Sequence, residues 1–363
     1  MTENQGGDEM NSRKRVLNYF AREKLDRVPI DYFANPGIDG KLKRHFGVHS
    51  DAALRKCLYA DFYGIEPRYT GKRLHAEKPG VRVSPDYGIV TRWVDNEYGG
   101  YEDYCEFPLE EADEETVMAW PMPSPDDYDY DEILEQCRSL TKDFSLFAGN
   151  AGYGCYINSN GFLRGMEQTF IDIITQDPAG ELLAKRRMEL ELARMERVLD
   201  KCGDYIDFIW LGEDLGTQQG PLISMESYRA VLKPWHQKYL DLAAAYHKKT
   251  MLHTCGSSSW VYPEMIEMGL TAVDTLQPEA NNMSPKYLKE QFGGKLCFHG
   301  CISTAGPVVE GTAEDVEKNV KETLEIMKPG YEYAFSPTHM LQDNTPLENV
   351  LAMYKAAVRY GTY

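Results

Sequence analysis

The chain has 363 residues, a formal net charge of −18 and a hydrophobic content of 42%. This length suffices for two open domains or for one large α/β barrel. The negative charge argues against a nucleic-acid-binding surface, which needs clustered lysines and arginines. No apolar run reaches the ~18 residues of a membrane-spanning helix, so we expect no membrane insertion.

The N-terminal residues 1–12 are polar and contain glycine, and we expect them to be disordered. They lack the apolar segment of a secretion signal. The eight cysteines are scattered along the chain, which is typical of reduced thiols rather than of a disulfide framework. We therefore expect a cytoplasmic protein.

The first half of the chain mixes two kinds of pattern. Residues 27–33 (RVPIDYF) form a short apolar segment that predicts a strand. Residues 80–109 are rich in β-branched and aromatic residues broken by turn signals, which predicts a β-hairpin insertion near the N-terminus of the fold. The other elements expected here are a charged helix at 11–23, a strand at 144–150, and helices at 161–175 and 178–202.

From residue 205 onward, strand and helix patterns alternate without a break. Five consecutive strand–helix units predict a parallel sheet, because parallel strands need a helical crossover between them. We expect a single-domain (β/α)8 TIM barrel over residues 1–363. A doubly wound sheet is the alternative, but no GxGxxG motif follows the first strand. The five strands are expected at 206–213, 250–256, 271–277, 295–301 and 331–337.

Chemically reactive side chains follow these strands. In a (β/α)8 barrel the carboxyl ends of all strands meet at one mouth, where the chemistry takes place. Residues distant in sequence would therefore be gathered there. The residues at these strand ends are Glu213 and Asp214, His253 and Cys255, Glu279, Cys301, and His339.

His253 and Cys255 are two residues apart on an extended segment, so their side chains point to the same side. Imidazole and thiolate are common zinc ligands, and a catalytic zinc usually has three protein ligands. Cys301 and His339 are both candidates for the third ligand. The carboxyl groups nearby could transfer protons, and the candidate catalytic residues are Glu213, Asp214 and Glu279.

Structural alternatives stay open for these residues. A histidine after an apolar strand can be a hydrogen-bonded core residue, and a cysteine can be a small buried apolar residue. Carboxylates after a strand can cap loops. A serine hydrolase is not favoured, since the chain has no GxSxG motif.

Three stretches resemble the uroporphyrinogen decarboxylase superfamily. They are HTCG at 253–256, FHGCIST at 298–304, and the closing segment AFSPTHMLQDNTPLENVLAMYKAAVRYG at 334–361. The likeness extends over roughly residues 15–361, and the superfamily implies a single (β/α)8 barrel. True uroporphyrinogen decarboxylases carry an arginine-rich stretch after the first strand, whereas this chain reads PIDYFANPGIDGKLKRHFG there.

The chain looks closest to the zinc-dependent methyltransferases that work with corrinoid (methylcobamide) proteins. Their zinc is held by an H-x-C motif and a distant cysteine, and His339 stands where that cysteine is expected. The resemblance implies a methyltransferase that moves a methyl group between a corrinoid protein and a small methyl donor or thiol acceptor. It implies zinc as cofactor, with the corrinoid (a cobalamin) on a partner protein, because this chain has no DxHxxG motif. It also leaves a homodimer open.

A metal-free decarboxylase of a tetrapyrrole or another carboxylate, a carboxy-lyase, is the alternative function. Such an enzyme needs basic residues to grip its substrate. The weak candidates in this sequence are Arg68, Arg92 and Arg164. A non-catalytic binder of small molecules on the same fold is a third hypothesis.

Overall fold

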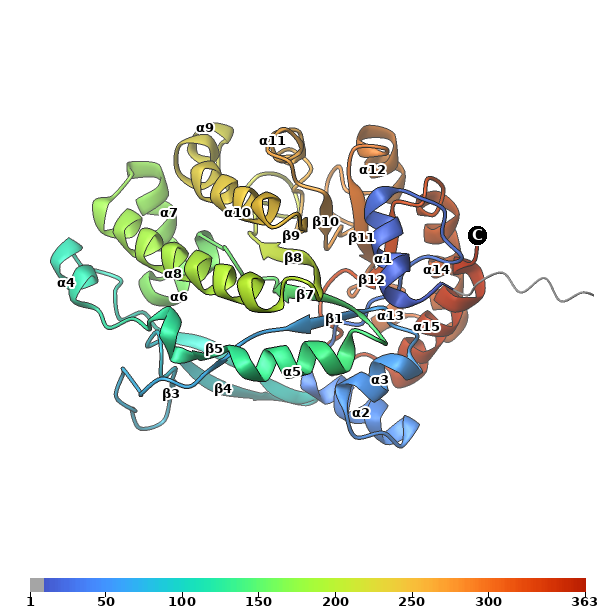
Figure 1. The fold of residues 1–363 in the computed structure, drawn as a ribbon, viewed down its shortest axis with the longest axis horizontal. Coiled ribbons are helices and arrows are strands. Elements are labelled where there is room, and N and C mark those ends of the chain that lie inside the picture. Colours follow the sequence, from blue (N-terminus) through green and yellow to red (C-terminus); the bar gives the residue numbers. More distant parts are fainter. Residues whose placement is uncertain (1–9) are drawn as a thin grey trace, which may run out of the picture. The chain divides into compact units, whose positions relative to one another are not determined.

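A computed structural model describes residues 10–363 and divides them into two compact units. The first unit comprises residues 10–63, 138–147 and 271–363, and the second comprises residues 64–137 and 148–270 (Figure 1). Helices and strands alternate in both units. No helix in residues 10–363 has the length and apolar character needed to cross a membrane.

The chain is ordered closer to its N-terminus than the sequence predicts. Residues 1–9 of the predicted disordered segment lie outside the described residues, but helix α1 (Ser12–Ala21) already begins at Ser12. The side chain of Asn11 accepts a hydrogen bond from the Lys14 N–H at 2.8 Å and caps this helix. The prediction of disorder up to residue 12 is therefore wrong for its last two residues.

Parallel strands form the core of the first unit. Strand β10 (Ala272–Asp274) pairs with β11 (Cys297–Ile302), and β11 pairs with β12 (Tyr333–Pro337), both in parallel. Every residue of the three strands is buried, as expected for a parallel sheet covered on both faces. The helices of this unit, besides α1, are α2 (Pro36–Phe46), α3 (Asp51–Cys57), α12 (Pro285–Phe292), α13 (Pro307–Glu310), α14 (Ala313–Met327) and α15 (Leu347–Gly361).

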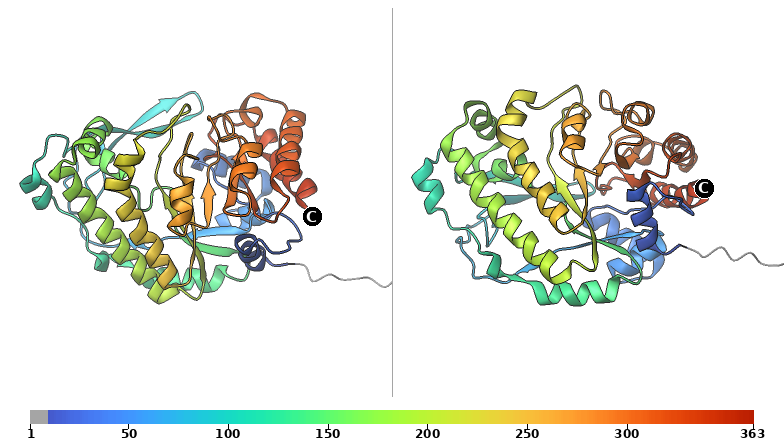
Figure 2. Two further views of the ribbon diagram at one scale, coloured as in Figure 1. Left: turned by 90° about the horizontal axis from the view of Figure 1, so that it is seen from above. Right: turned by 45° about the horizontal axis from the view of Figure 1, so that its top comes forward.

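The second unit also contains a buried parallel pair, formed by β8 (Ile206–Gly212) and β9 (Lys249–His253). Its long helices α8 (Pro178–Cys202) and α10 (Lys233–Ala245) lie side by side (Figures 1 and 2). Other elements are β2 (Arg68–Tyr69), α4 (Glu114–Ala119), a 3-10 turn (Pro125–Asp127), β6 (Tyr128–Asp129), α6 (Ile157–Arg164), α7 (Met166–Thr175), α9 (Met225–Ser227) and α11 (Tyr262–Glu267). Three elements run from one unit into the other along the chain: β1 (Phe62–Ile65), α5 (Tyr130–Leu140) and β7 (Ser145–Gly149).

The α/β class with strand–helix repetition is confirmed. The strands of the main sheet follow the order β1-β7-β8-β9-β10-β11-β12. The segment at 80–109 contains the antiparallel hairpin of β4 (Val90–Asn96) and β5 (Gly99–Glu106), joined by β3 (Arg82–Val83). A closed barrel of eight strands and a single domain over 1–363 stay predictions, since the sheet has seven strands.

The segment predicted as the first strand, residues 27–33, does not form one. It makes isolated bridges, of which Ile30 with Phe335 is parallel. The Pro29 carbonyl accepts from the Phe335 N–H, and the Asp31 N–H donates to the Phe335 carbonyl. Because Pro29 has no N–H to donate, this stretch pairs with β12 only locally.

Two helical stretches are irregular, each at an identifiable residue. The helix expected at 161–175 ends and restarts at Gly165, whose φ of 78° is left-handed and suits a glycine. The helix after β8 contains a π-helical turn (Tyr228–Leu232) just before Pro234. Proline cannot donate to the preceding turn, which explains a break in the regular hydrogen-bond ladder there.

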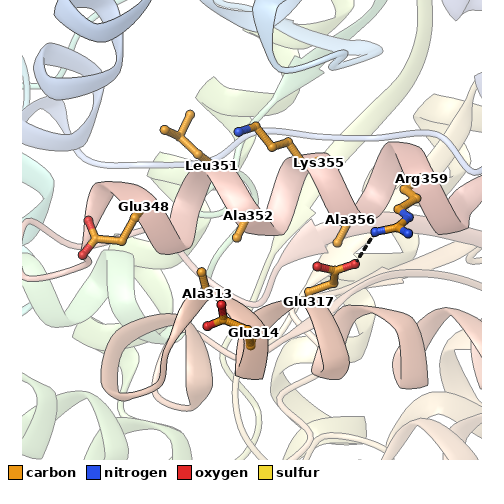
Figure 3. Close-up of a pocket in the computed structure, with 9 residues that line it drawn as sticks. All are labelled: Ala313, Glu314, Glu317, Glu348, Leu351, Ala352, Lys355, Ala356 and Arg359. Atoms are coloured by element: carbon orange, nitrogen blue, oxygen red, sulfur yellow. Dashed lines mark hydrogen bonds and ion pairs between the residues drawn. The ribbon is translucent and has the colours of Figure 1, made fainter.

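Helices α14 and α15 leave a surface groove of about 430 Å³ between them (Figure 3). Ala313, Ala352 and Ala356 line it with short side chains, and an ion pair between Arg359 and Glu317 at 2.8 Å lies at one end. This pair is exposed, so it contributes little to stability.

A buried carboxylate organises the N-terminal part of the first unit. Asp61 is fully buried and accepts hydrogen bonds from the guanidinium groups of Arg15 and Arg27, both at 2.6 Å. The Ile30 N–H donates to the same carboxylate at 2.9 Å. One charged group, the Asp61 carboxylate, therefore holds together helix α1, the segment around residue 30 and the start of β1.

We expect the substitution Asp61→Asn to lower the free energy of unfolding by about 3 kcal/mol or more, because it leaves two arginines without their buried counter-charge. Urea denaturation measures the change. Glu322→Gln is the control, since its partner Lys318 lies 4.0 Å away on an exposed helix face; here the change should stay below about 0.5 kcal/mol. Equal losses in both variants would contradict the prediction.

Candidate metal centre

His253 and Cys255 lie next to each other at the end of β9, in the second unit. The parallel pairing of β8 with β9 sets Gly212 opposite His253, so the two strands end together. His253 is buried, Cys255 is half-buried, and the Cys255 Sγ lies 3.4 Å from the His253 Nε2. The Trp210 ring packs edge-on against the imidazole at 6.1 Å between centroids. A thiol sulfur and an imidazole nitrogen are thus adjacent, as the H-x-C spacing predicts.

Asp214 orients the segment that carries Cys255. One carboxylate oxygen accepts from the Cys255 N–H at 3.0 Å, and the other accepts from the Asn158 side-chain amide at 2.7 Å. Burial alone would raise the pKa of Asp214, but the nearby His253 and these hydrogen bonds lower it below its usual value. An ionised Asp214 therefore fixes the backbone beside the thiol.

Glu213, its neighbour in sequence, points into the protein interior instead. Its carboxylate accepts from the N–H groups of Tyr156 at 2.7 Å and Ile157 at 3.0 Å, where α6 begins. The Cys155 thiol at 3.3 Å and the His236 imidazole at 3.2 Å complete its surroundings. These contacts match the loop-capping alternative, and a role for Glu213 in proton transfer stays a prediction.

The remaining predicted residues lie in the first unit. Cys301 is buried in β11 with a left-handed φ of 68°, and burial together with the Asp274 and Glu279 carboxylates raises the pKa of its thiol. Glu279 is exposed in the loop after β10. His339 is half-buried just after β12, with its ring 6.1 Å from the Phe33 ring.

Three residues in the described part of the chain, His253, Cys255 and His339, make up a group that could bind a metal ion, each offering one ligand atom. Cys301 does not belong to this group. All eight cysteines are free thiols. Cys297 is fully buried, and its thiol donates to the Tyr19 carbonyl at 3.3 Å.

Sequence analysis missed His299, which lies in the middle of β11. Its Nδ1 is 2.6 Å from the Asp274 carboxylate, and its Nε2 is 3.3 Å from the Asp31 carboxylate. Arg55 in turn contacts Asp31 at 3.0 Å, and all three members of the Asp–His–Asp array are buried. The available signal was a histidine and an aspartate, each inside an apolar strand, on consecutive strands of the sheet.

Comparisons with known proteins give one family model and several solved structures that this chain resembles. Residues 209–360 match the family model described as uroporphyrinogen decarboxylase (URO-D). No curated protein matches the sequence. A methyltransferase from Methanosarcina mazei has a similar structure, with a TM-score of 0.66 and 17% identity over 97% of this chain and 99% of that chain. The similarity shows a shared fold.

Two further structures match more distantly. The endo-1,4-beta-xylanase XylE of Penicillium canescens has a TM-score of 0.36 and 10% identity, over 61% of this chain and 88% of that chain. A D-psicose 3-epimerase, solved in the presence of D-fructose, has a TM-score of 0.32 and 10% identity, over 69% and 91%.

The His299 array predicts a specific pH dependence of stability. Burial alone would lower the pKa of His299, but the carboxylates of Asp274 and Asp31 raise it to about 9. Because the pKa is higher in the folded state, the stabilisation is full below the unfolded value of about 6.5 and is lost as the pH rises through about 9. We expect the difference in unfolding free energy between the wild type and His299→Gln to shrink over this range.

Urea denaturation at several pH values between 6 and 10 measures this difference. His247→Gln, at an exposed histidine, is the control for replacing an imidazole by an amide. A constant difference for His299→Gln would show that the imidazole is not held as a cation.

Proposed function

We propose that the chain belongs to the uroporphyrinogen decarboxylase superfamily and is a zinc-dependent methyltransferase. In this proposal it moves a methyl group between a corrinoid protein and a small methylated donor or thiol acceptor. His253, Cys255 and His339 bind the zinc. The observation that carries the proposal is the group of one thiol and two imidazoles that could bind a metal.

The chemistry of these donors fits zinc. Bonds from zinc to sulfur and nitrogen of about 2.3 and 2.0 Å, at a tetrahedral angle, separate the two ligand atoms by about 3.5 Å. The Cys255 Sγ and the His253 Nε2 are 3.4 Å apart before any metal is considered. Three protein ligands leave one tetrahedral position for a substrate, which is typical of catalytic zinc.

Zinc bound here supplies Lewis acidity that keeps a thiol ionised at neutral pH. The chain's own residues hold the site in shape. The Asp214 carboxylate accepts from the Cys255 N–H, and the His253 carbonyl accepts from the Glu213 N–H at 2.9 Å. Both ligand positions, at the end of β9 and just after it, are thus fixed through their backbone. Glu279, exposed after β10, is available to exchange a proton with a substrate or its leaving group.

A metal-free decarboxylase is the second candidate, favoured by the description of the matching family model. It needs cationic groups free to bind substrate carboxylates. Arg164 is buried and paired with Asp172 at 2.5 Å, and Arg68 is paired with Glu132 at 3.0 Å. Arg92 is exposed on β4. Two of the three arginines are thus already committed, which favours the methyltransferase.

The metal content of the purified protein tests the proposal directly. We expect about one zinc per chain in the wild type and a loss of bound zinc in Cys255→Ser, because the hydroxyl is a poor replacement for a thiolate. Cys105→Ser, a half-buried cysteine in the hairpin, is the control and should keep the metal. A wild-type protein that neither contains nor takes up zinc would leave the decarboxylase as the better explanation.

The identity of the third ligand is tested separately. We expect His339→Ala to weaken zinc binding at least tenfold, whereas Cys301→Ser keeps it, because His339 and not Cys301 belongs to the group that could bind a metal. Competition with a zinc-binding dye measures both affinities. The opposite result would assign the third position to Cys301.

A further inference from the structure

The start of helix α6 donates hydrogen bonds to both acidic residues that follow β8. The backbone N–H groups of Tyr156 and Ile157 donate to the Glu213 carboxylate at 2.7 and 3.0 Å. The side-chain amide of the next residue, Asn158, donates to the Asp214 carboxylate at 2.7 Å. Three consecutive residues therefore hold two consecutive acids.

Each of the two acids in turn contacts one residue of the H-x-C pair. The Glu213 N–H donates to the His253 carbonyl at 2.9 Å, and the Asp214 carboxylate accepts from the Cys255 N–H at 3.0 Å. Two successive hydrogen bonds therefore connect the backbone of each proposed metal ligand to the start of α6.

The two ligand positions differ in how firmly the sheet holds them. His253 is the last residue of β9 and is paired with Gly212 of β8. Cys255 lies two residues beyond the end of the strand, so its position depends on contacts made by the loop. The Asp214 carboxylate is the acceptor for the Cys255 N–H. The position of the thiol therefore depends on where the Asp214 side chain is held.

The loops after β8 and β9 are in close backbone contact. The Ser257 N–H donates to the Thr217 carbonyl at 2.7 Å. Gly256 has a left-handed φ of 69°, and a Cβ at this residue would lie only 2.4 Å from the Gly216 carbonyl oxygen. Backbones that approach this closely cannot slide past each other without a clash. A displacement of the loop after β8 is therefore passed on to Cys255.

Asn158 contributes to this arrangement through its side chain. Tyr156 and Ile157 donate through backbone N–H groups, which any residue except proline supplies. The half-buried Asn158 instead donates from a neutral amide, which leaves the negative charge of Asp214 in place beside the ligand pair. A carboxylate close to the ligands favours the binding of a divalent cation.

We propose that Asn158 is a positioning residue of the metal centre. Its amide holds the Asp214 carboxylate, which holds the Cys255 backbone so that the thiol lies beside the His253 imidazole before a metal binds. The inference rests on the proposed function, since it takes His253 and Cys255 as metal ligands. Their ligand atoms are already 3.4 Å apart. Residues that orient metal ligands typically contribute about 10- to 100-fold to metal affinity.

Cobalt(II) is a suitable probe for the full chain, because its visible spectrum reports both its affinity and its bond to a thiolate. We expect Asn158→Ala to weaken cobalt binding about tenfold or more and to change the spectrum of the bound metal, since the sulfur is no longer held in place. Asn158→Leu, which keeps the size of the side chain but donates no hydrogen bond, should behave in the same way.

Asn18→Ala is the matched control. Asn18 is also half-buried, and its side-chain amide donates to the Lys24 carbonyl at 2.9 Å, in the first unit. This substitution should leave the affinity and the spectrum unchanged. Circular dichroism of the metal-free variants, at the temperature of the titration, separates a loss of metal binding from a loss of fold.

A double-mutant cycle tests whether Asn158 acts through Asp214. Asp214→Ala removes the carboxylate that Asn158 holds. Adding Asn158→Ala to Asp214→Ala should therefore weaken cobalt binding by less than about twofold, because coupled residues do not have additive effects. If Asn158 contributed by a separate route, the two losses would add.

Three results would overturn the proposal. They are equal cobalt affinities of the wild type and Asn158→Ala, additive losses in the double variant, and a weaker affinity of Asn158→Ala that comes with an unchanged cobalt spectrum. A wild-type protein that binds neither cobalt nor zinc would overturn the proposed function as well. Normal binding by the wild type with no effect of Asn158→Ala would overturn the role of Asn158 alone.

Discussion

The Glu213 carboxylate is buried at the end of β8, where it accepts two backbone N–H groups from the start of α6 as well as the Cys155 thiol and the His236 imidazole. Burying a carboxylate without hydrogen-bond donors costs several kcal/mol. The four contacts therefore make it possible for the Glu213 side chain to lie in the interior. Because the Glu213 N–H also binds the His253 carbonyl, the ends of β8 and β9 and the start of α6 share one anchor. The hydrogen bonds of Glu213 therefore help to position His253. Asp214 positions Cys255 in the same way, because its carboxylate accepts from the Cys255 N–H.

Charged groups play a comparable role inside the first unit. Asp61 holds two arginines near the N-terminus, and His299 lies between two aspartates within the sheet. Aliphatic side chains commonly fill such positions in parallel α/β folds. Buried ion groups of this kind bring little net stability, but removing one partner leaves an uncompensated buried charge.

Much of the fold was predictable from the sequence because its signals are local. The five strands after residue 205 are apolar runs between helical patterns, and each is present with bounds shifted by a few residues. Where the predicted helices and strands differ from the structure, the cause is a single residue whose backbone conformation or missing N–H the pattern did not show. Gly165 interrupts a helix through its left-handed φ, and Pro29 limits the expected first strand to isolated bridges. The H-x-C pair was found because two residues on an extended segment necessarily point the same way.

The sequence by itself determined the α/β class, the alternation of strands and helices, and the positions of His253, Cys255 and His339 directly after apolar strands. Only the tertiary structure decided that Glu213 and Asp214, adjacent in sequence, have different roles. Their partners at the start of α6 are more than 50 residues away in the chain, and no local pattern encodes such pairs. The same holds for His299, since a histidine in an apolar strand becomes a buried cation only when folding brings carboxylates from other segments against both ring nitrogens.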